Sequence, residues 1–465
     1  MTMNVAVVFA DPMLHRVFAR EYRRRLDDAQ FDKVFLTPGI PVNPRKVASM
    51  TTSGFTFAAG NARQLLAAPR YLMSAVRGRL SRRDPKTWVV GSAFGVADGA
   101  LAFARAAREL PDPPRVVWLH QSADEAADAL EAGFETVERD SDAGLQETLG
   151  AGLVAVTHGF GDVNRFGVTG AVIVQLWHGS PLKKLHADSP GVIGAGRLGR
   201  IPGIPRLMRW AYRRGSRRIN LLPVSSPFFQ PFLRSAFHLT EQVQVLGEPR
   251  TDVLFAGSAE QRTAASRSLI SSHLGELGER RVILYAPTWR DGSPDPSIPT
   301  ASDWEAIEAF CQRHDLLLVI RPHRLSVGSY QHVSDRVRLL PASMQPDSMP
   351  LLWGVSTLIT DYSSMMIDYM ATERPVVLLA PDLAAYQGGR GLYFDYASLI
   401  DRPWCTSWTQ ALTQLEALFA DDACYADAAE HSRALGARFH TFTDGNNAAR
   451  VAEAAAILVG ERFDR

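Results

Sequence analysis

Short apolar runs recur along the chain, separated by stretches that have the spacing of amphipathic helices. In the first half these runs lie at residues 4–10, 33–37, 87–94, 115–120, 152–158 and 171–177. Short apolar runs bounded by polar or turn residues are typical of strands that a parallel sheet buries on both faces. We therefore predict that each run is a buried parallel strand.

The segments between the runs have a helical pattern. Residues 96–111, VADGALAFARAARELP, carry apolar residues at three- and four-residue spacing and end at prolines. Prolines commonly follow the end of a helix because they cannot continue it. Strands that alternate with helices predict a doubly wound α/β sheet.

A second series of apolar runs follows, and it predicts a second α/β domain. Its runs lie at residues 281–289, 315–323, 357–363 and 374–381. A polar, helix-prone stretch at 251–281 separates the two series, so we predict domains at 1–255 and 256–465, with the last helix packing back on the first domain. Ligands of such sheets bind outside the carboxyl ends of the strands, so we expect the site in a cleft between the two sheets.

Composition narrows the class of protein. The chain has 465 residues, with 50 lysines and arginines against 49 aspartates and glutamates, so its net charge of +1 gives no reason to expect a nucleic-acid partner. The three cysteines, Cys311, Cys405 and Cys424, fit neither a disulfide framework nor a metal motif. The start lacks a basic leader and no apolar run is long enough to span a membrane, so we expect a cytoplasmic protein.

The first candidate for chemistry is a histidine at the end of the run 171–177. His178 and Gly179 follow this predicted strand, and Lys183 and Lys184 come shortly after. A histidine can accept a hydroxyl proton near neutral pH, glycine lets the backbone approach a ligand, and lysines can neutralise phosphate oxygens. The alternative is a histidine whose ring is simply hydrogen-bonded within a turn.

Two serines open a predicted helix after the run 357–361. Ser363 and Ser364 could cap this helix, and the same hydroxyls with the free amides of a helix start also form an anion site. Asp368 lies one turn deeper on the same helix face, where it could orient a group of the site or form a helix ion pair. Capping and binding both remain open.

Basic and hydroxyl side chains follow two more predicted strands. Arg321, His323 and Arg324 end one strand, and Thr288, Trp289 and Arg290 end another. Arginine and histidine can bind diphosphate oxygens by charge-assisted hydrogen bonds. The alternatives are a solvated basic turn and, for the tryptophan, a place in the core.

Seven motifs in series resemble the CDP-glycerol glycerophosphotransferase family of teichoic-acid synthesis. They are LWHGSPLKK, LGEPRTDVLF, ILYAPTWRDG, VIRPHR, LITDYSSMMIDYM, RPVVLL and YQGGRGLYFDY, and they span roughly residues 150–440. The resemblance implies a GT-B-like fold, with the nucleotide chiefly on the C-terminal domain. Arg321 stands where the family often has lysine, and DRPW follows FDY where a Pro-Gly pair is common.

The resemblance also implies roles for the candidate residues. His178 would be the base or a phosphate ligand, and Asp368 a second catalytic residue. The donor would be held by Lys183, Thr288, Arg290, Arg321, His323, Ser363, Ser364 and Arg390. No cofactor or metal ligand is expected, and a metal requirement stays open.

The reaction implied is transfer of a polyol phosphate from CDP-glycerol or CDP-ribitol to a hydroxyl of a teichoic-acid-like or capsular polymer precursor, with release of CMP. One alternative is a GT-B glycosyltransferase that uses a nucleotide sugar. Another is a catalytically silent nucleotide-binding assembly protein. Whether the unit is glycerol or ribitol phosphate, and what the acceptor is, stays open.

A basic segment predicts where the protein acts. Residues Gly196–Asn220 are rich in arginine, with apolar residues between the charges. Such a segment is typical of a helix that lies on anionic lipid, so we predict an enzyme peripheral to the inner face of the membrane, where a lipid-linked acceptor would also lie. The alternative is a solvated helix that packs its apolar residues inward.

Overall fold

A computed structural model describes the protein at residues 76–189, 203–290, 294–323, 326, 330, 332–389 and 391–463. All of these belong to one unit of the chain, Ala62–Arg465. The strands predicted at 4–10 and 33–37 lie outside the described residues, as do Arg324, Arg390 and part of the basic segment.

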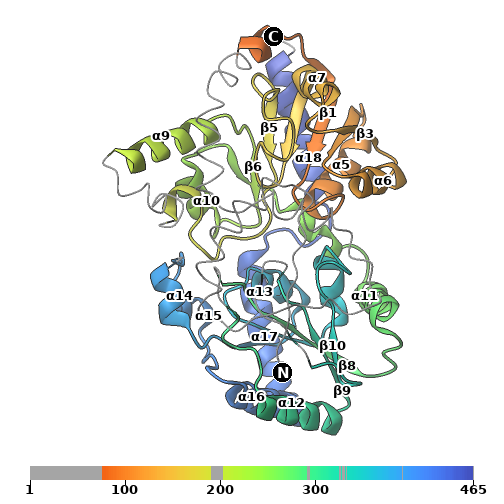
Figure 1. Cartoon of the computed structure of the whole chain (residues 1–465), viewed down its shortest axis with the longest axis vertical. Helices are drawn as coiled ribbons and strands as arrows, with labels where there is room; N and C mark the ends of the chain where they lie inside the picture. Colours follow the sequence, from red (N-terminus) through yellow and green to blue (C-terminus); the bar gives the residue numbers. More distant parts are fainter. Residues whose placement is uncertain are drawn as a thin grey trace, which may run out of the picture. The chain divides into compact units, whose positions relative to one another are not determined.

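The first sheet is built from five parallel strands in the order β3-β2-β1-β4-β5 (Figure 1). The strands are β1 (Asp84–Gly91), β2 (Arg115–His120), β3 (Glu135–Glu138), β4 (Ala151–Val156) and β5 (Val172–Gln175). The helices between them are α5 (Asp98–Arg108), α6 (Ala123–Glu131) and α7 (Asp142–Gly150). Every residue of β4 and β5 is buried, as expected for strands covered on both faces.

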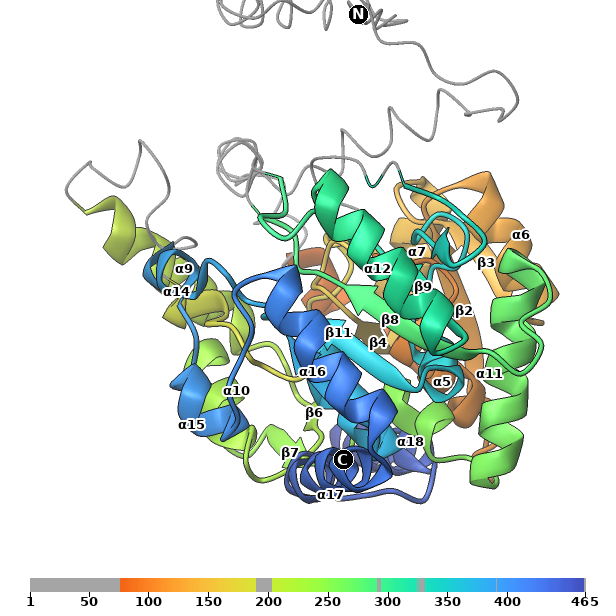
Figure 2. The same cartoon turned by 90° about the horizontal axis from the view of Figure 1, so that it is seen from below.

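The second sheet repeats this topology in the order β10-β9-β8-β11-β12. Its strands are β8 (Arg281–Ala286), β9 (Leu316–Ile320), β10 (Val337–Leu339), β11 (Thr357–Thr360) and β12 (Val376–Leu378). Its helical segments are α11 (Ala259–Leu274), α12 (Ala301–Arg313), η4 (Met349–Gly354), α13 (Met365–Tyr369), η5 (Met370–Thr372), α14 (Leu383–Gly389), α15 (Tyr396–Ile400), α16 (Trp408–Ala420) and α17 (Asp422–Phe439). In Figure 2, α12 and α16 lie side by side on this sheet.

The chain between the two sheets in sequence adds a two-stranded sheet and short helices beside β5 (Figure 1). It contains η1 (His186–Asp188), α9 (Ile204–Ser216), β6 (Leu222–Val224), α10 (Gln230–Phe237), β7 (Val243–Val245) and η3 (Pro249–Leu254). The strands β6 and β7 pair in parallel, and Leu221 bridges to β5. The last helix, α18 (Asn447–Phe463), packs against α5 of the first sheet. The predicted boundary between residues 255 and 256 stays a prediction.

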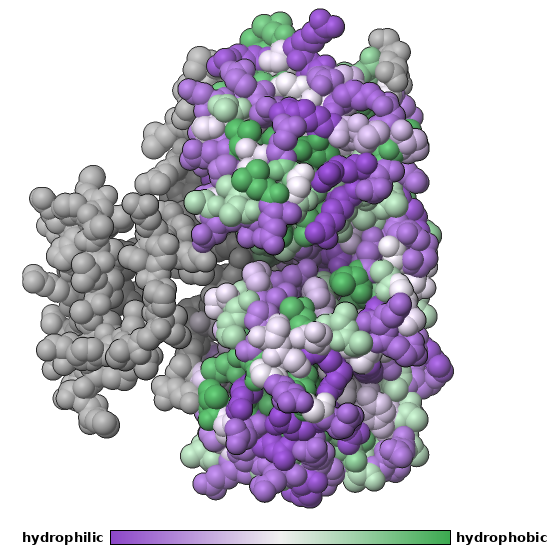
Figure 3. Space-filling model, turned by 90° about the vertical axis from the view of Figure 1, so that its right-hand side faces the viewer, coloured by the Kyte–Doolittle hydropathy of each residue, from purple (hydrophilic) through white to green (hydrophobic). Residues whose placement is uncertain are grey.

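Local sequence signals explain where the helices of the second sheet begin. Ser258 and Gln261 form a reciprocal capping box at the start of α11, and Thr300 and Asp303 form another at α12. Each pair satisfies two backbone amides that a helix start leaves open. On the face in Figure 3, apolar and polar side chains are interspersed over the described atoms, as on ordinary solvated surface.

Both sheets reverse their strand order once, and these two points locate the candidate site. The reversal falls between β1 and β4 in the first sheet and between β8 and β11 in the second. Ligands of open α/β sheets bind at the carboxyl ends of the strands beside such a point. The two predicted doubly wound parallel sheets are thus confirmed, and the loops after β4, β5, β8 and β11 are the ones to examine.

Candidate active site

At the reversal point of the second sheet, one carboxylate links the loop after β8 to the loop after β11. Asp361, directly after β11, accepts the backbone N–H of Thr288 at 2.9 Å. Its other oxygen accepts a hydrogen bond from Arg290 at 3.0 Å. Asp361 is buried, so this contact fixes the loop after β8 against the start of the loop after β11.

Arg290 lies in a cage of carboxylates and aromatic rings. Its Nε donates to Asp382 at 2.8 Å, and its guanidinium carbon lies 5.2 Å and 4.9 Å from the ring centroids of Tyr362 and Tyr386. Burial opposes the charge, but the hydrogen bonds that Arg290 donates to Asp382 and the charge of Asp361 outweigh burial and raise the pKa of Arg290. The guanidinium is a permanent cation that holds the loop, and donor binding by Arg290 stays a prediction.

The hydroxyl of Thr288 is the unusual group at this edge. Thr288 is only 4% exposed, and its Oγ1 has no hydrogen-bond partner among the described residues. Buried hydroxyls are nearly always paired, because an unpaired one keeps its desolvation cost. The Thr288 hydroxyl thus lacks a partner among the described residues, and donor binding by Thr288 stays a prediction.

The two predicted serines lie where the two halves of the chain meet. Ser363 Oγ accepts the backbone N–H of Met365 at 3.3 Å, so this serine has the capping contact. Ser364 occupies the N-cap position of α13, and its side chain makes no capping hydrogen bond. A Cβ atom placed on Gly179 would lie 3.0 Å from Ser364 Oγ, so the loop after β5 touches this hydroxyl.

Asp368 lies beneath these serines in a buried ion-pair network. Its two oxygens accept hydrogen bonds from Arg250 at 3.0 Å and 2.6 Å, and Arg250 Nε donates to Glu248 at 2.8 Å. All three residues are almost fully buried. These are the contacts of a residue that positions its neighbours, and a catalytic role for Asp368 stays a prediction.

His178 projects from a loop with unusual backbone geometry. Trp177 has a φ of 60° and Gly179 a φ of 147°, values that are uncommon for a bulky residue and natural for glycine. Such geometry clusters at functional sites, where the surrounding structure holds it in place. The ring of His178 lies 4.1 Å from that of Trp177 and stacks on that of His158 at 3.9 Å, with an angle of 3° between the planes.

Lys183 links the His178 loop to the second half of the chain. It pairs with Leu392 in a short antiparallel bridge, and its Nζ lies 5.6 Å from the centroid of the Tyr386 ring. The same ring receives the guanidinium of Arg290. Two cations, predicted from motifs about a hundred residues apart, thus share one aromatic ring.

Arg321 and His323 lie in different environments although only Pro322 separates them in the motif. Arg321 is buried and donates to the carbonyls of Leu340, Gln345 and Pro346 at 3.2, 2.7 and 3.1 Å. Burial lowers the pKa of its guanidinium to about 10. His323 is exposed and stacks on Trp289 at 6.0 Å, so it can meet a ligand, whereas Arg321 ties two loops together. Donor binding by either residue stays a prediction.

Four residues of this region were not singled out from the sequence. His158 is the last residue of the apolar run 152–158, and a histidine at the end of such a run is the signal that could have found it. Glu248 and Arg250 stand in the LGEPR motif, but nothing in the motif shows that Asp368 is their partner. Tyr386 had no signal, because only the fold brings it to Arg290 and Lys183.

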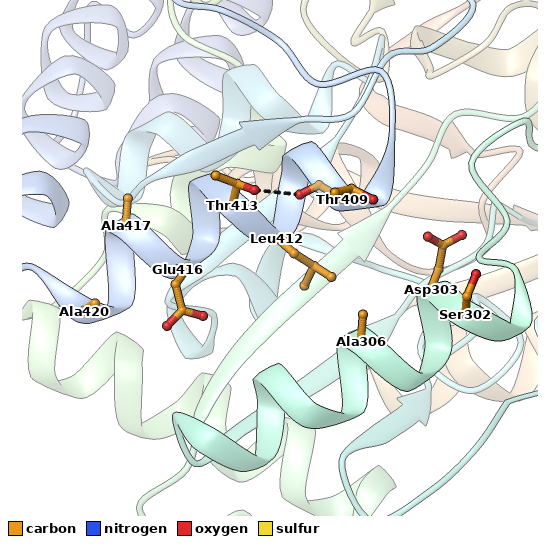
Figure 4. A pocket seen from close by; sticks show the side chains of 9 residues that line it. All are labelled: Ser302, Asp303, Ala306, Thr409, Leu412, Thr413, Glu416, Ala417 and Ala420. Atoms are coloured by element: carbon orange, nitrogen blue, oxygen red, sulfur yellow. Dashed lines mark hydrogen bonds between the residues drawn. The ribbon is translucent and has the colours of Figure 1, made fainter.

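A groove on the second sheet's helices lies away from the candidate site. A groove of about 560 Å³ runs between α12 and α16, lined by residues such as Asp303, Leu412 and Glu416, and it contains none of the predicted site residues (Figure 4). No group of three or more histidine, cysteine, aspartate or glutamate side chains in the described ranges could hold a metal ion.

Comparisons with known proteins agree with this arrangement. The sequence profile of a family described as CDP-Glycerol:Poly(glycerophosphate) glycerophosphotransferase matches residues 72–456. The chain is 28% identical over 291 residues to a teichoic acid glycerol-phosphate transferase of Staphylococcus aureus, covering 60% of this chain and 70% of that protein. It is 28% identical over 238 residues to the teichoic acid ribitol-phosphate polymerase TarK of the same organism, covering 49% of this chain and 42% of that protein.

A solved structure shares the fold. The structure of the wall teichoic acid polymerase TagF has a TM-score of 0.66 and 22% identity, and covers 88% of this chain and 98% of that one. At this identity the likeness concerns the fold, which is the predicted pair of doubly wound sheets. Since the family profile spans most of its length, the chain belongs to the CDP-glycerol:poly(glycerophosphate) glycerophosphotransferase family, a family of polyol phosphate transferases.

Proposed function

We propose that this chain transfers glycerol phosphate from CDP-glycerol to a hydroxyl group of a teichoic-acid-like or capsular polymer precursor, and releases CMP. The observation that carries the proposal is the meeting of the His178 loop with the serine-opened segment, where Gly179 abuts Ser364 Oγ. This contact supports the proposal because it brings a histidine loop and a serine hydroxyl from the two halves of the chain to one place. Phosphoryl transfer needs little else than positioning and charge stabilisation.

In the proposed reaction, the acceptor hydroxyl attacks the β-phosphorus of the CDP-polyol. A new phosphorus–oxygen bond forms, the bond from this phosphorus to the bridging oxygen breaks, and the electron pair leaves with CMP. His178 accepts the hydroxyl proton, the general-base role that imidazole fills most often. The imidazole gives the proton back to solvent after the product leaves.

The donor diphosphate would be held by groups from both halves. Ser364 and Thr288 supply hydroxyls, and Lys183 and the exposed His323 supply positive charge or N–H donors. Hydrogen bonds between such donors and charged phosphate oxygens are stronger than those between neutral groups. Stabilising the charge on the transferring phosphoryl group is the largest contribution expected from these residues.

The helix α9 supports the further proposal that the enzyme works on an anionic membrane surface, reaching a lipid-linked acceptor there. Arg206, Arg209, Arg213 and Arg214 are exposed, and Trp210 is 58% exposed. Exposed arginines with tryptophan favour the headgroup region of anionic bilayers. None of the described helices is both long and apolar enough to cross a bilayer. Flotation with anionic vesicles tests the surface: binding that survives charge reversal of the four arginines would contradict it.

The experiment that tests the reaction is release of CMP from a defined donor. The protein is incubated with CDP-glycerol, CDP-ribitol or a nucleotide sugar, together with a glycerol-phosphate-primed acceptor, and the nucleotide product is identified. We expect CMP, formed faster from CDP-glycerol than from CDP-ribitol. Release of a nucleoside diphosphate from the sugar donor would indicate a glycosyltransferase, and faster use of CDP-ribitol would assign the other polyol.

A further inference from the structure

The rings of His158 and His178 stack on each other at the carboxyl edge of the first sheet. His158 follows β4 and His178 follows β5, and these two strands are paired neighbours in the sheet. Their rings lie parallel within 3° at a centroid distance of 3.9 Å. Aromatic rings more often meet offset or edge-on, so a close parallel pair implies that both loops are held in place.

The loop that carries His158 is held by a buried carboxylate. One oxygen of Asp162 accepts the backbone N–H of Thr157 at 2.9 Å, that of His158 at 2.7 Å, and the hydroxyl of Thr157 at 3.0 Å. Asp162 is only 4% exposed, and any Cβ at Gly91 would overlap its carbonyl oxygen. The end of β1 therefore supports the His158 loop from below.

His158 is also held through its ring. Phe94 packs edge-on against it at 4.5 Å, while the His178 ring lies flat against it. Two other rings lie beside His178. That of Trp177 is tilted by 37° and comes from the same strained loop, and that of Phe94 packs edge-on at 5.8 Å. His158 is therefore the parallel surface that comes from an independently fixed loop.

We propose that His158 is a positioning residue that holds the His178 ring in the plane from which it accepts the acceptor proton. Face-to-face contact fixes the ring plane without covering the ring edge. His178 Nδ1 is buried, so Nε2 is the nitrogen that would accept the proton. Misplacing a catalytic group by about 1 Å can cost roughly 10²-fold in rate. This inference rests on the proposed role of His178 as the base. Because His158 acts through His178, its loss affects turnover and not donor affinity.

The test compares two substitutions of His158 in the full chain. We expect His158→Ala to lower kcat for CMP release by about 10- to 100-fold with little change in the KM for CDP-glycerol. His158→Phe keeps a flat ring and should recover most of kcat. In a His178→Ala background, His158→Ala should cause no further loss, because residues that act as one unit are not additive. An unchanged kcat in His158→Ala, or an equal further loss in the double variant, would overturn the proposal.

A matched control variant shows whether loss of any stacked histidine lowers kcat, and the NMR signals of His178 report the stack without relying on activity. His332 also stacks on a ring, that of Trp304 at 4.8 Å, and is not one of the residues assigned to the site, so His332→Ala should leave kcat unchanged. In histidine-labelled protein, the ring-carbon-bound protons of His178 should shift when His158 becomes alanine, as a ring current is lost. Unchanged His178 signals would overturn the stack itself. Wild-type protein that releases no CMP, with shifted signals, would refute the proposed reaction and leave the stack established.

Discussion

The carboxyl edges of the two sheets have the same topology but are built from different chemistry. At the first sheet, the loops after β4 and β5 carry stacked rings, His158 and His178, on a backbone with positive φ at Trp177. At the second sheet, the loops after β8 and β11 are joined by an ion pair between Arg290 and Asp361. The edge of the first sheet thus carries imidazole rings, and the edge of the second sheet carries hydroxyl side chains on loops that an ion pair joins.

This difference implies a division of work between the two edges. A ring that accepts a proton must be oriented, and packing against other rings fixes orientation without adding charge. A diphosphate must be bound by groups whose positions do not change when the ligand leaves, and buried ion pairs provide such a frame. We therefore expect substitutions at the first edge to change turnover and substitutions at the second edge to change donor affinity.

The largest effect is expected for His178→Ala. Loss of a general base typically lowers the rate about 10²–10⁴-fold, so kcat should fall in this range with a nearly unchanged KM for CDP-glycerol. His178→Asn retains a hydrogen bond but cannot accept the proton, so it should not restore kcat. Steady-state CMP release measures both constants.

Circular dichroism and thermal melting must accompany these variants, because a misfolded protein also loses activity. If His178→Ala is folded and raises KM while keeping kcat, the ring is a phosphate ligand and the division between the edges fails. Wild-type turnover in the folded variant would remove His178 from the mechanism.

Substitutions in the buried ion-pair network of Glu248, Arg250 and Asp368 should change the stability of the fold more than the kinetics. Breaking a buried ion pair by removing one charge costs about 3–5 kcal/mol, so Asp368→Asn should lower the melting temperature, because Arg250 loses its bidentate partner. Below the melting transition, kcat should stay within about tenfold of wild type, since Asp368 supports the site from behind. Asp427→Asn, at the exposed pair with Arg402, is the control and should cost at most about 1 kcal/mol. A large loss of kcat with an unchanged melting temperature would instead make Asp368 catalytic.

The sheets could be predicted from the sequence because buried parallel strands are short apolar runs, and the runs at 152–158 and 281–289 became β4 and β8. Residues directly after these strands could be predicted for the same reason. The pairing of Arg250 with Asp368 could not be predicted, since the two are 118 positions apart and a helix ion pair explains Asp368 equally well from the sequence. Arg321 shows the converse, because a buried arginine that binds carbonyls has the same sequence signal as one that binds phosphate.

A smaller effect is expected when Ser363 and Ser364 are replaced together by alanine. Hydrogen bonds to charged groups contribute about 1.5–3 kcal/mol each, so losing such contacts to the diphosphate should raise the KM for CDP-glycerol at least about tenfold. Loss of the Ser363 capping contact should cost only about 1 kcal/mol of stability. Ser407→Ala removes the cap of α16, which accepts the N–H of Gln410 at 3.3 Å, and should lower stability alone. Normal donor kinetics in the double variant would exclude the serines from donor binding.

The smallest effect, and the sharpest test of the second edge, is expected for Thr288→Val. Valine replaces the hydroxyl by a methyl group of similar size and keeps the backbone N–H that Asp361 accepts. The Thr288 hydroxyl has no partner among the described residues, so its removal should leave the melting temperature unchanged or slightly raised. If the hydroxyl donates to the donor diphosphate, affinity should fall about 5- to 10-fold, equivalent to roughly 1 kcal/mol.

Thr357→Val is the matched control for this substitution. The Thr357 hydroxyl is also buried without a partner in the described part of the chain, but it lies at the first residue of β11, at the opposite edge of the sheet. It should change stability in the same direction and leave the affinity for CDP-glycerol unaltered, as measured by titration calorimetry. Equal affinities in the wild type and both variants would mean that the Thr288 hydroxyl faces no ligand, and the donor would then depend on the serines and on the cations alone.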